Sequence, residues 1–175
     1  MSMRKVALCS AVLFALTVGA LAAETPNLGK PIDPKDIAPW DISIMPDGTG
    51  LPPGSGTPAQ GAPIFAQKCA ACHGDKGTGG IAASVTAGPS RATLDGGKTI
   101  ANFWPYATTV FDFIRRAMPY NRPHSLTDQE VYALTAYLLS LNNLIGPNDV
   151  MNAQTLPKVK MPNRDNFIIR FPERI

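Results

Sequence analysis

The chain has 175 residues, with 16 lysines and arginines against 13 acidic residues, so its formal net charge is only +3. Nucleic-acid binding requires clustered basic residues, and this balance gives no sign of it. The length is enough for one domain with its own core but not comfortably for two.

The N-terminal residues have the pattern of a secretory signal peptide. Arg4 and Lys5 form a basic start, an apolar run follows over residues 6–21, and small residues end the segment at Ala23. We therefore expect residues 1–23 to be removed and the mature chain to be periplasmic. A membrane anchor is the alternative, but the run is short for a span and no stop-transfer pattern follows, so no membrane span is expected in the mature chain.

Residues 24–56 are rich in proline and glycine. Proline removes backbone N–H donors and fixes φ, so this segment is predicted to be an extended arm without regular structure. A disordered linker is the alternative. Ile37, Trp40 and Ile42 favour an arm that docks on its own domain or on a partner, because disordered segments are usually poor in such side chains.

A first helix is predicted from Thr57 to about Cys72. Gly61, Phe65 and Cys69 recur every four residues and therefore share one face. Glycine within a helix costs about 1 kcal/mol relative to alanine, so its presence here favours a close helix crossing. A poorly formed helix start is the alternative.

Cys69, Cys72 and His73 form a C-x-x-C-H motif, the attachment site of a c-type haem. Two thiols at this spacing can bond both vinyl groups of one porphyrin while the adjacent imidazole reaches the iron. A redox dithiol would need a βαβ setting. A zinc site needs four ligands, and the one remaining cysteine, Cys9, lies in the leader. The motif predicts one covalently attached haem c with His73 as an iron ligand, and no disulfide.

Glycine-rich residues 74–104 show no periodicity and are predicted to be a long loop ordered by the haem edge. A short helix is predicted over residues 108–117, with a threonine cap. The last helix has the clearest start, because Thr127 and Glu130 form a capping box. It is expected to end near residue 142, and residues 147–175 are predicted to be an irregular tail. The apolar stripe of the last helix comprises Leu134, Tyr137, Leu138 and Leu141.

Met118 is the predicted second iron ligand, since methionine sulfur is the usual partner of histidine in electron-transfer haems. It directly follows a predicted helix, and Pro119 stiffens the turn that would present the sulfur. His124, Met161 and an open site are the alternatives. The second ring nitrogen of His73 also needs a partner, and a backbone carbonyl near Pro89 is the candidate.

Together these motifs resemble those of class I cytochromes c over residues 57–145. The resemblance is carried by Gly61, Phe65, Cys69-x-x-Cys72-His73, Gly88-Pro89, Met118-Pro119 and Tyr137. It implies an all-α fold with a single cytochrome domain, residues 57–146, between the arm and the tail. It also implies that Gly61 and Phe65 meet the face of Tyr137 where the first and last helices cross. Pro89 would supply the carbonyl for His73.

The flanks are similar to the cytochrome subunit of sulfane dehydrogenase, from the Sox thiosulfate-oxidising system, and to related sulfite dehydrogenase cytochromes. This resemblance rests on the segments Trp40-Asp41-Ile42, residues 46–56, residues 103–109 and residues 160–165. It implies electron transfer from a molybdenum-cofactor dehydrogenase subunit to a soluble cytochrome acceptor. Some members carry two haems, whereas this sequence has one C-x-x-C-H motif.

The predicted function is therefore that of a non-catalytic electron-transfer subunit, because the sequence contains no evident set of catalytic acid, base and nucleophile. A freely diffusing cytochrome that serves a terminal oxidase is the main alternative. A haem enzyme or gas sensor would need a vacant or displaceable site opposite His73. A dithiol oxidoreductase would need free thiols at Cys69 and Cys72.

Overall fold

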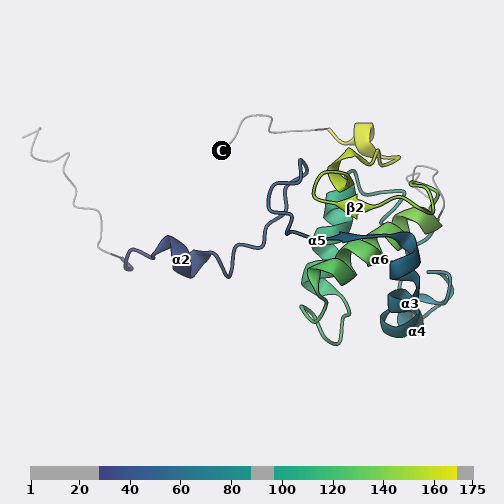
Figure 1. Cartoon of the computed structure of the whole chain (residues 1–175), viewed down its shortest axis with the longest axis horizontal. Coiled ribbons are helices and arrows are strands. Elements are labelled where there is room, and N and C mark those ends of the chain that lie inside the picture. Colours follow the sequence, from purple (N-terminus) through teal and green to yellow (C-terminus); the bar gives the residue numbers. More distant parts are fainter. Residues whose placement is uncertain (1–27, 88–96, 169–175) are drawn as a thin grey trace, which may run out of the picture. The chain divides into compact units, whose positions relative to one another are not determined.

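The computed structural model describes residues 28–87 and 97–168, which belong to two units that divide between Asp41 and Ile42 (Figure 1). The predicted leader, residues 1–23, lies outside the described residues. None of the helices in the described ranges is both long enough and apolar enough to cross a bilayer.

Residues 28–41 of the first unit contain the short helix α2 (Pro34–Ile37), within the segment that was predicted to lack regular structure. Asp33 caps this helix and accepts a hydrogen bond of 3.0 Å from the Lys35 N–H. A capping aspartate followed by proline in the first turn explains why a helix begins there. The large apolar side chains in the described part of this unit include four that are exposed: Leu28, Ile32, Ile37 and Trp40.

The second unit is built from helices around one core, which confirms the predicted all-α class. Its helices are α3 (Pro58–Lys68), α4 (Ala70–His73), α5 (Ala107–Ala117) and α6 (Asp128–Leu141). Strands β1 (Ser55–Gly56) and β2 (Met151–Asn152) pair antiparallel. Two short 3-10 helices follow, η1 (Leu156–Lys158) and η2 (Arg164–Asn166).

Helix α6 is buried on nearly every side rather than along one stripe. Six successive residues, 131–136, are buried, as are Leu138 and Leu139. The helix is enclosed because it contacts α3, α5 and the β1–β2 pair (Figure 1). Its predicted capping box is confirmed, since the Thr127 hydroxyl accepts from the Glu130 N–H and the Glu130 carboxylate accepts from the Thr127 N–H.

Helices α3 and α6 cross closely at Gly61, as predicted. A Cβ at this position would collide with the backbone carbonyl of Ala133, so only glycine permits the approach. One turn further along α3, the rings of Phe65 and Tyr137 pack with their centroids 5.3 Å apart. This crossing fixes the end of α3, from which the C-x-x-C-H motif continues.

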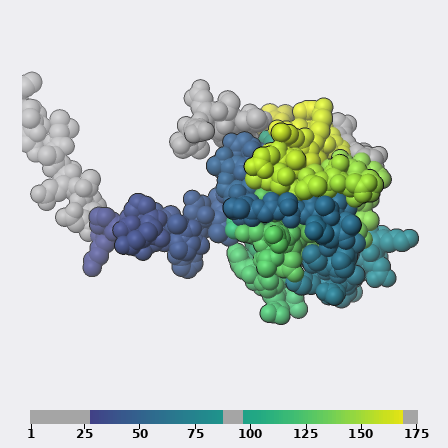
Figure 2. Space-filling model, viewed as in Figure 1, coloured from purple at the N-terminus to yellow at the C-terminus, as the bar shows by residue number. Residues whose placement is uncertain are grey.

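The flanking segments pack against the helices. The Tyr132 hydroxyl donates to the Pro52 carbonyl at 2.9 Å, and the Arg116 guanidinium donates to the Ile42 carbonyl at 3.1 Å. In the predicted irregular tail, three apolar side chains belong to the core: Met151, Leu156 and Met161. The compact unit therefore takes in residues on both sides of the predicted 57–146 domain (Figure 2).

The predicted start of α5 is wrong. The helix begins at Ala107 rather than Thr108, and its N-cap residue, Tyr106, makes no side-chain capping hydrogen bond. Thr108 lies inside the helix and is 1% exposed. Tertiary packing sets the start of this helix, and a local cap does not. The first turns are buried against the rest of the unit at Ala107, Thr108, Val110 and Phe111.

Candidate haem-attachment site

The motif residues lie at a break between two helices. The predicted continuous helix to Cys72 is interrupted, since α3 ends at Lys68 and Cys69 adopts φ −126° and ψ −37°. The single turn α4 follows, and the N–H groups of Cys72 and His73 both donate to the Cys69 carbonyl, at 3.1 and 3.0 Å. Both cysteines and the histidine are therefore brought together by one compact turn.

The chain after His73 folds back onto this turn. Gly74 has φ +81°, and a Cβ there would collide with the Thr78 carbonyl, so the reversal requires glycine. The Ala82 N–H then donates to the Cys72 carbonyl at 2.8 Å. As predicted, the described parts of residues 74–104 contain no helix or strand. We call residues 69–87 the attachment segment.

The hydrogen bond of His73 assigns different roles to its two ring nitrogens. Its Nδ1 lies 2.8 Å from the carbonyl oxygen of Ala83. A carbonyl can only accept, so Nδ1 is the donor of this hydrogen bond, and Nε2 is the ring nitrogen left to bind a metal. The single hydrogen on Nδ1 is thus used by Ala83, while Pro89 lies outside the described residues. Sequence reasoning missed Ala83 because a backbone acceptor has no residue-type signature.

The two thiols differ in environment. Burial is the main effect that raises the pKa of the Cys69 thiol to about 11, opposed by the positive charge of Lys68, whereas Cys72 is exposed. A reactive redox cysteine has a lowered pKa, so a protonated Cys69 disfavours a dithiol oxidoreductase. Among the described residues, no three histidine, cysteine or acidic side chains lie together where they could hold a metal ion.

Met118 lies directly after α5 and is only partly buried at the edge of the core. Its N–H donates to the Ile114 carbonyl at 3.1 Å, which extends the hydrogen-bond pattern of the helix to this residue. The other candidates have different surroundings. Met161 is 1% exposed and fills the core, the usual role of methionine, and His124 is exposed with φ +60°.

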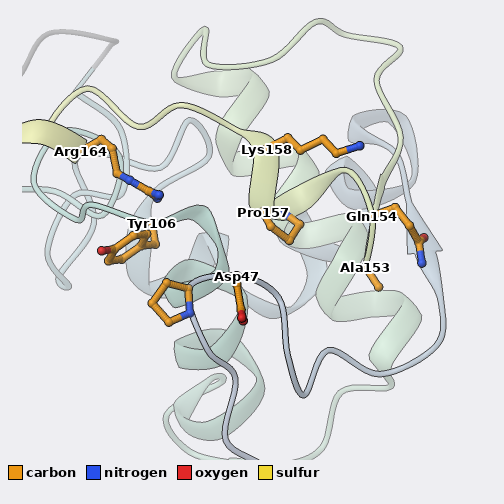
Figure 3. A pocket seen from close by; sticks show the side chains of 8 residues that line it. Asp47, Tyr106, Ala153, Gln154, Pro157, Lys158 and Arg164 are labelled. Atoms are coloured by element: carbon orange, nitrogen blue, oxygen red, sulfur yellow. The ribbon is translucent and has the colours of Figure 1, made fainter. Parts of the chain in front are cut away.

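An open pocket of about 610 Å³ lies on the surface formed by the flanking segments (Figure 3). Its lining includes Asp47, Pro157 and Lys158, and the Arg164 guanidinium stacks over the Tyr106 ring at 4.2 Å. None of the motif residues lines this pocket. It is therefore separate from the haem-attachment site.

The donors present fit a c-type haem. One turn offers two thiols and an imidazole whose Nε2 is free, and the Met118 thioether lies outside the core interior. Imidazole and thioether are ligands of haem iron in electron-transfer proteins, whereas carboxylate-rich sites suit hard cations. The chain thus supplies both the attachment chemistry and candidate iron ligands.

Comparison with known proteins identifies the family of the chain. The sequence model of the family "Cytochrome c" matches residues 58–142. A chain of the crystal structure of the sulfane dehydrogenase SoxCD from Paracoccus pantotrophus is 36% identical, with a TM-score of 0.75, over 84% of this chain and 73% of that one. No curated protein sequence matches. The chain belongs to the cytochrome c family, whose members carry covalently bound haem c, and it resembles the cytochrome of the Sox system.

Proposed function

We propose that the protein is a periplasmic monohaem cytochrome that carries electrons from a molybdenum-dependent sulfane or sulfite dehydrogenase subunit to a soluble acceptor. The observation that carries this proposal is the 36% identity with a chain of SoxCD across 84% of the sequence. A match of this extent includes the flanking segments. Similarity to cytochrome c domains in general would not extend to these segments. The protein would itself perform no bond chemistry on the sulfur compound.

Four side chains are proposed to bind the haem. Cys69 and Cys72 would form the thioether bonds, and His73 Nε2 and the Met118 sulfur would bind the iron. The bound haem supplies the one-electron chemistry. The chain sets the environment, because the Ala83 carbonyl orients the imidazole through Nδ1 and raises its basicity. The predicted role of Pro89, to supply a carbonyl to His73, falls on a residue outside the described ranges and stays a prediction.

The first unit supports attachment to a partner. Leu28 and Trp40 are 86% and 84% exposed, and Ile32 is also exposed. Aromatic and large apolar side chains exposed in one short segment are typical of residues that become buried in an interface. A dehydrogenase subunit is the proposed partner.

The test is isolation of the native protein. We expect it to elute from size exclusion with a second subunit, and metal analysis to find molybdenum in a fixed ratio to haem iron. A haem protein that elutes alone would instead support the freely diffusing cytochrome. Periplasmic fractionation and N-terminal sequencing of the same sample test the leader, with Glu24 as the expected first residue.

The proposed ligand Met118 can be tested separately. Met118→Ala should keep the covalent haem but lose the sulfur-to-iron absorption band, and the reduced protein should then bind carbon monoxide. Met45→Ala is the control, because Met45 is 52% exposed and is not expected to bind iron. Carbon monoxide binding by the unmodified protein would favour a gas sensor or haem enzyme.

A further inference from the structure

Asn142 connects the end of α6 to the attachment segment. The residue is 0% exposed and caps the helix C-terminus. Its Nδ2 donates to the Leu138 carbonyl at 2.8 Å and to the Val85 carbonyl at 3.0 Å, and its Oδ1 accepts from the Ala87 N–H at 2.9 Å. Both donors of one amide are thus used, one on the helix and one on the loop. We call this set of contacts the Asn142 bridge.

The Asn142 bridge lies two residues from the carbonyl that contacts the imidazole. The Val85 N–H also donates to the Gly77 carbonyl at 2.8 Å, while Ala82 is bonded to the Cys72 carbonyl on the other side. Hydrogen bonds therefore hold the backbone on both sides of Ala83. The Ala83 carbonyl between them accepts a hydrogen bond from His73, with Nδ1 2.8 Å from the carbonyl oxygen.

We propose that Asn142 is a positioning residue that keeps the Ala83 carbonyl on His73 and so sets the reduction potential of the haem iron. The proposal rests on the proposed binding of iron by His73. A hydrogen bond from Nδ1 makes the imidazole a stronger donor, which favours oxidised iron. Loosening the Ala83 carbonyl weakens that bond and favours reduced iron. In this proposal Asn142 acts on the imidazole through the loop, by its bonds to Val85 and Ala87.

The test compares two buried asparagines in the holoprotein. Asn142→Leu keeps the volume but removes every amide contact of the Asn142 bridge. Asn163→Leu is the matched control, because Asn163 is 7% exposed and donates to the Phe103 carbonyl at 2.7 Å, outside the attachment segment. Both variants should lose stability, so stability alone does not decide the question. Two other measurements do.

The first measurement is the reduction equilibrium against a fixed redox partner. Asn142→Leu should raise the ratio of reduced to oxidised iron by roughly three- to tenfold. A tenfold change in this ratio corresponds to about 59 mV for one electron. The second is solvent exchange of the His73 Nδ1 hydrogen in the NMR spectrum of the reduced protein. Exchange should be faster in Asn142→Leu, and Asn163→Leu should match the unmodified protein in both measurements.

A second variant covers the case in which Asn142→Leu does not fold. Ala87→Pro removes the N–H that donates to Asn142, at an exposed position and without changing α6. It should shift the equilibrium in the same direction, by a smaller factor. Unchanged potential and exchange in the folded variants, or an equal shift in Asn163→Leu, would overturn the proposal. Absence of covalent haem from the unmodified protein would instead reject the proposed haem binding.

Discussion

The attachment segment and the α6 environment are stabilised in different ways. Around α6, large side chains are fully buried, as where the rings of Phe111 and Tyr132 pack with centroids 4.5 Å apart. In residues 69–87, Gly77 is the single buried residue, and hydrogen bonds of the backbone and of side chains such as Asn142 hold the fold. Ile81 in this segment is 92% exposed.

The difference indicates a division of tasks within one chain. Apolar burial makes α3, α5 and α6 a scaffold that positions the end of α3 through the Gly61 crossing. The attachment segment has little burial of its own and leaves Cys72 accessible, with His73 only partly buried. Chemistry at the thiols and the imidazole requires such access. Four variants test whether the two regions depend on these different interactions.

The largest effect is expected from removing both thiols. Cys69→Ala with Cys72→Ala should abolish covalent haem completely, because each thioether bond needs a cysteine sulfur. Haem staining of a denaturing gel and the pyridine haemochrome spectrum measure this loss. Cys9→Ala, in the predicted leader, should leave the haem content unchanged. Covalent haem retained by the double variant would contradict the assignment of the motif.

The next effect concerns the tail as part of the scaffold. Met161→Ala should lower the free energy of unfolding by about 3 kcal/mol, because the side chain is 1% exposed within the core and its removal leaves a cavity. Urea unfolding measures the loss. Met45→Ala, at an exposed position, should change stability by less than about 0.5 kcal/mol. Equal effects of the two substitutions would show that the tail does not contribute to the core.

The helix crossing should respond to a single added methyl group. Gly61→Ala should destabilise the protein by about 2 kcal/mol, because its Cβ would overlap the Ala133 carbonyl and force the helices apart. Thermal unfolding of the holoprotein gives the difference. Gly97→Ala is the control, since nothing lies within 4 Å of a Cβ at that position. A neutral Gly61→Ala would mean that the crossing can widen freely.

The smallest effect is electrostatic. The Lys68 ammonium donates a hydrogen bond to the Glu130 carboxylate, with Nζ 2.6 Å from the carboxylate oxygen. This hydrogen bond is the main reason that the pKa of Glu130 lies below its ordinary value of 4.5. A lowered pKa gives stability that is present above pH 4.5 and is lost as the pH falls through the folded-state pKa. Glu130→Gln should therefore cost up to about 1 kcal/mol at pH 7.

Urea unfolding at several pH values checks this sign. The difference between Glu130→Gln and the unmodified protein should shrink as the pH is lowered below 4.5. Gln129→Glu is a useful contrast because Gln129 is exposed beside Glu130 but is not bonded to Lys68 in the described contacts. A difference that stays constant with pH would exclude the proposed contribution of the charged pair.

The sequence by itself determined the features that depend on neighbouring residues. The capping box of Thr127 and Glu130 and the end of α6 near residue 142 agree with the structure, because each needs partners within one helical turn. The α3–α6 crossing was also predicted, because the glycine and aromatic positions resemble those of class I cytochromes c.

Only the tertiary structure decided the contacts that join distant parts of the chain. Asn142 bonds residues 55 and 57 positions away, and the His73 imidazole uses a backbone carbonyl that any residue could provide. The buried start of α5 and the core side chains of the tail follow no local period. In each case the deciding free energy comes from burial or from a partner remote in sequence, which a local pattern does not record.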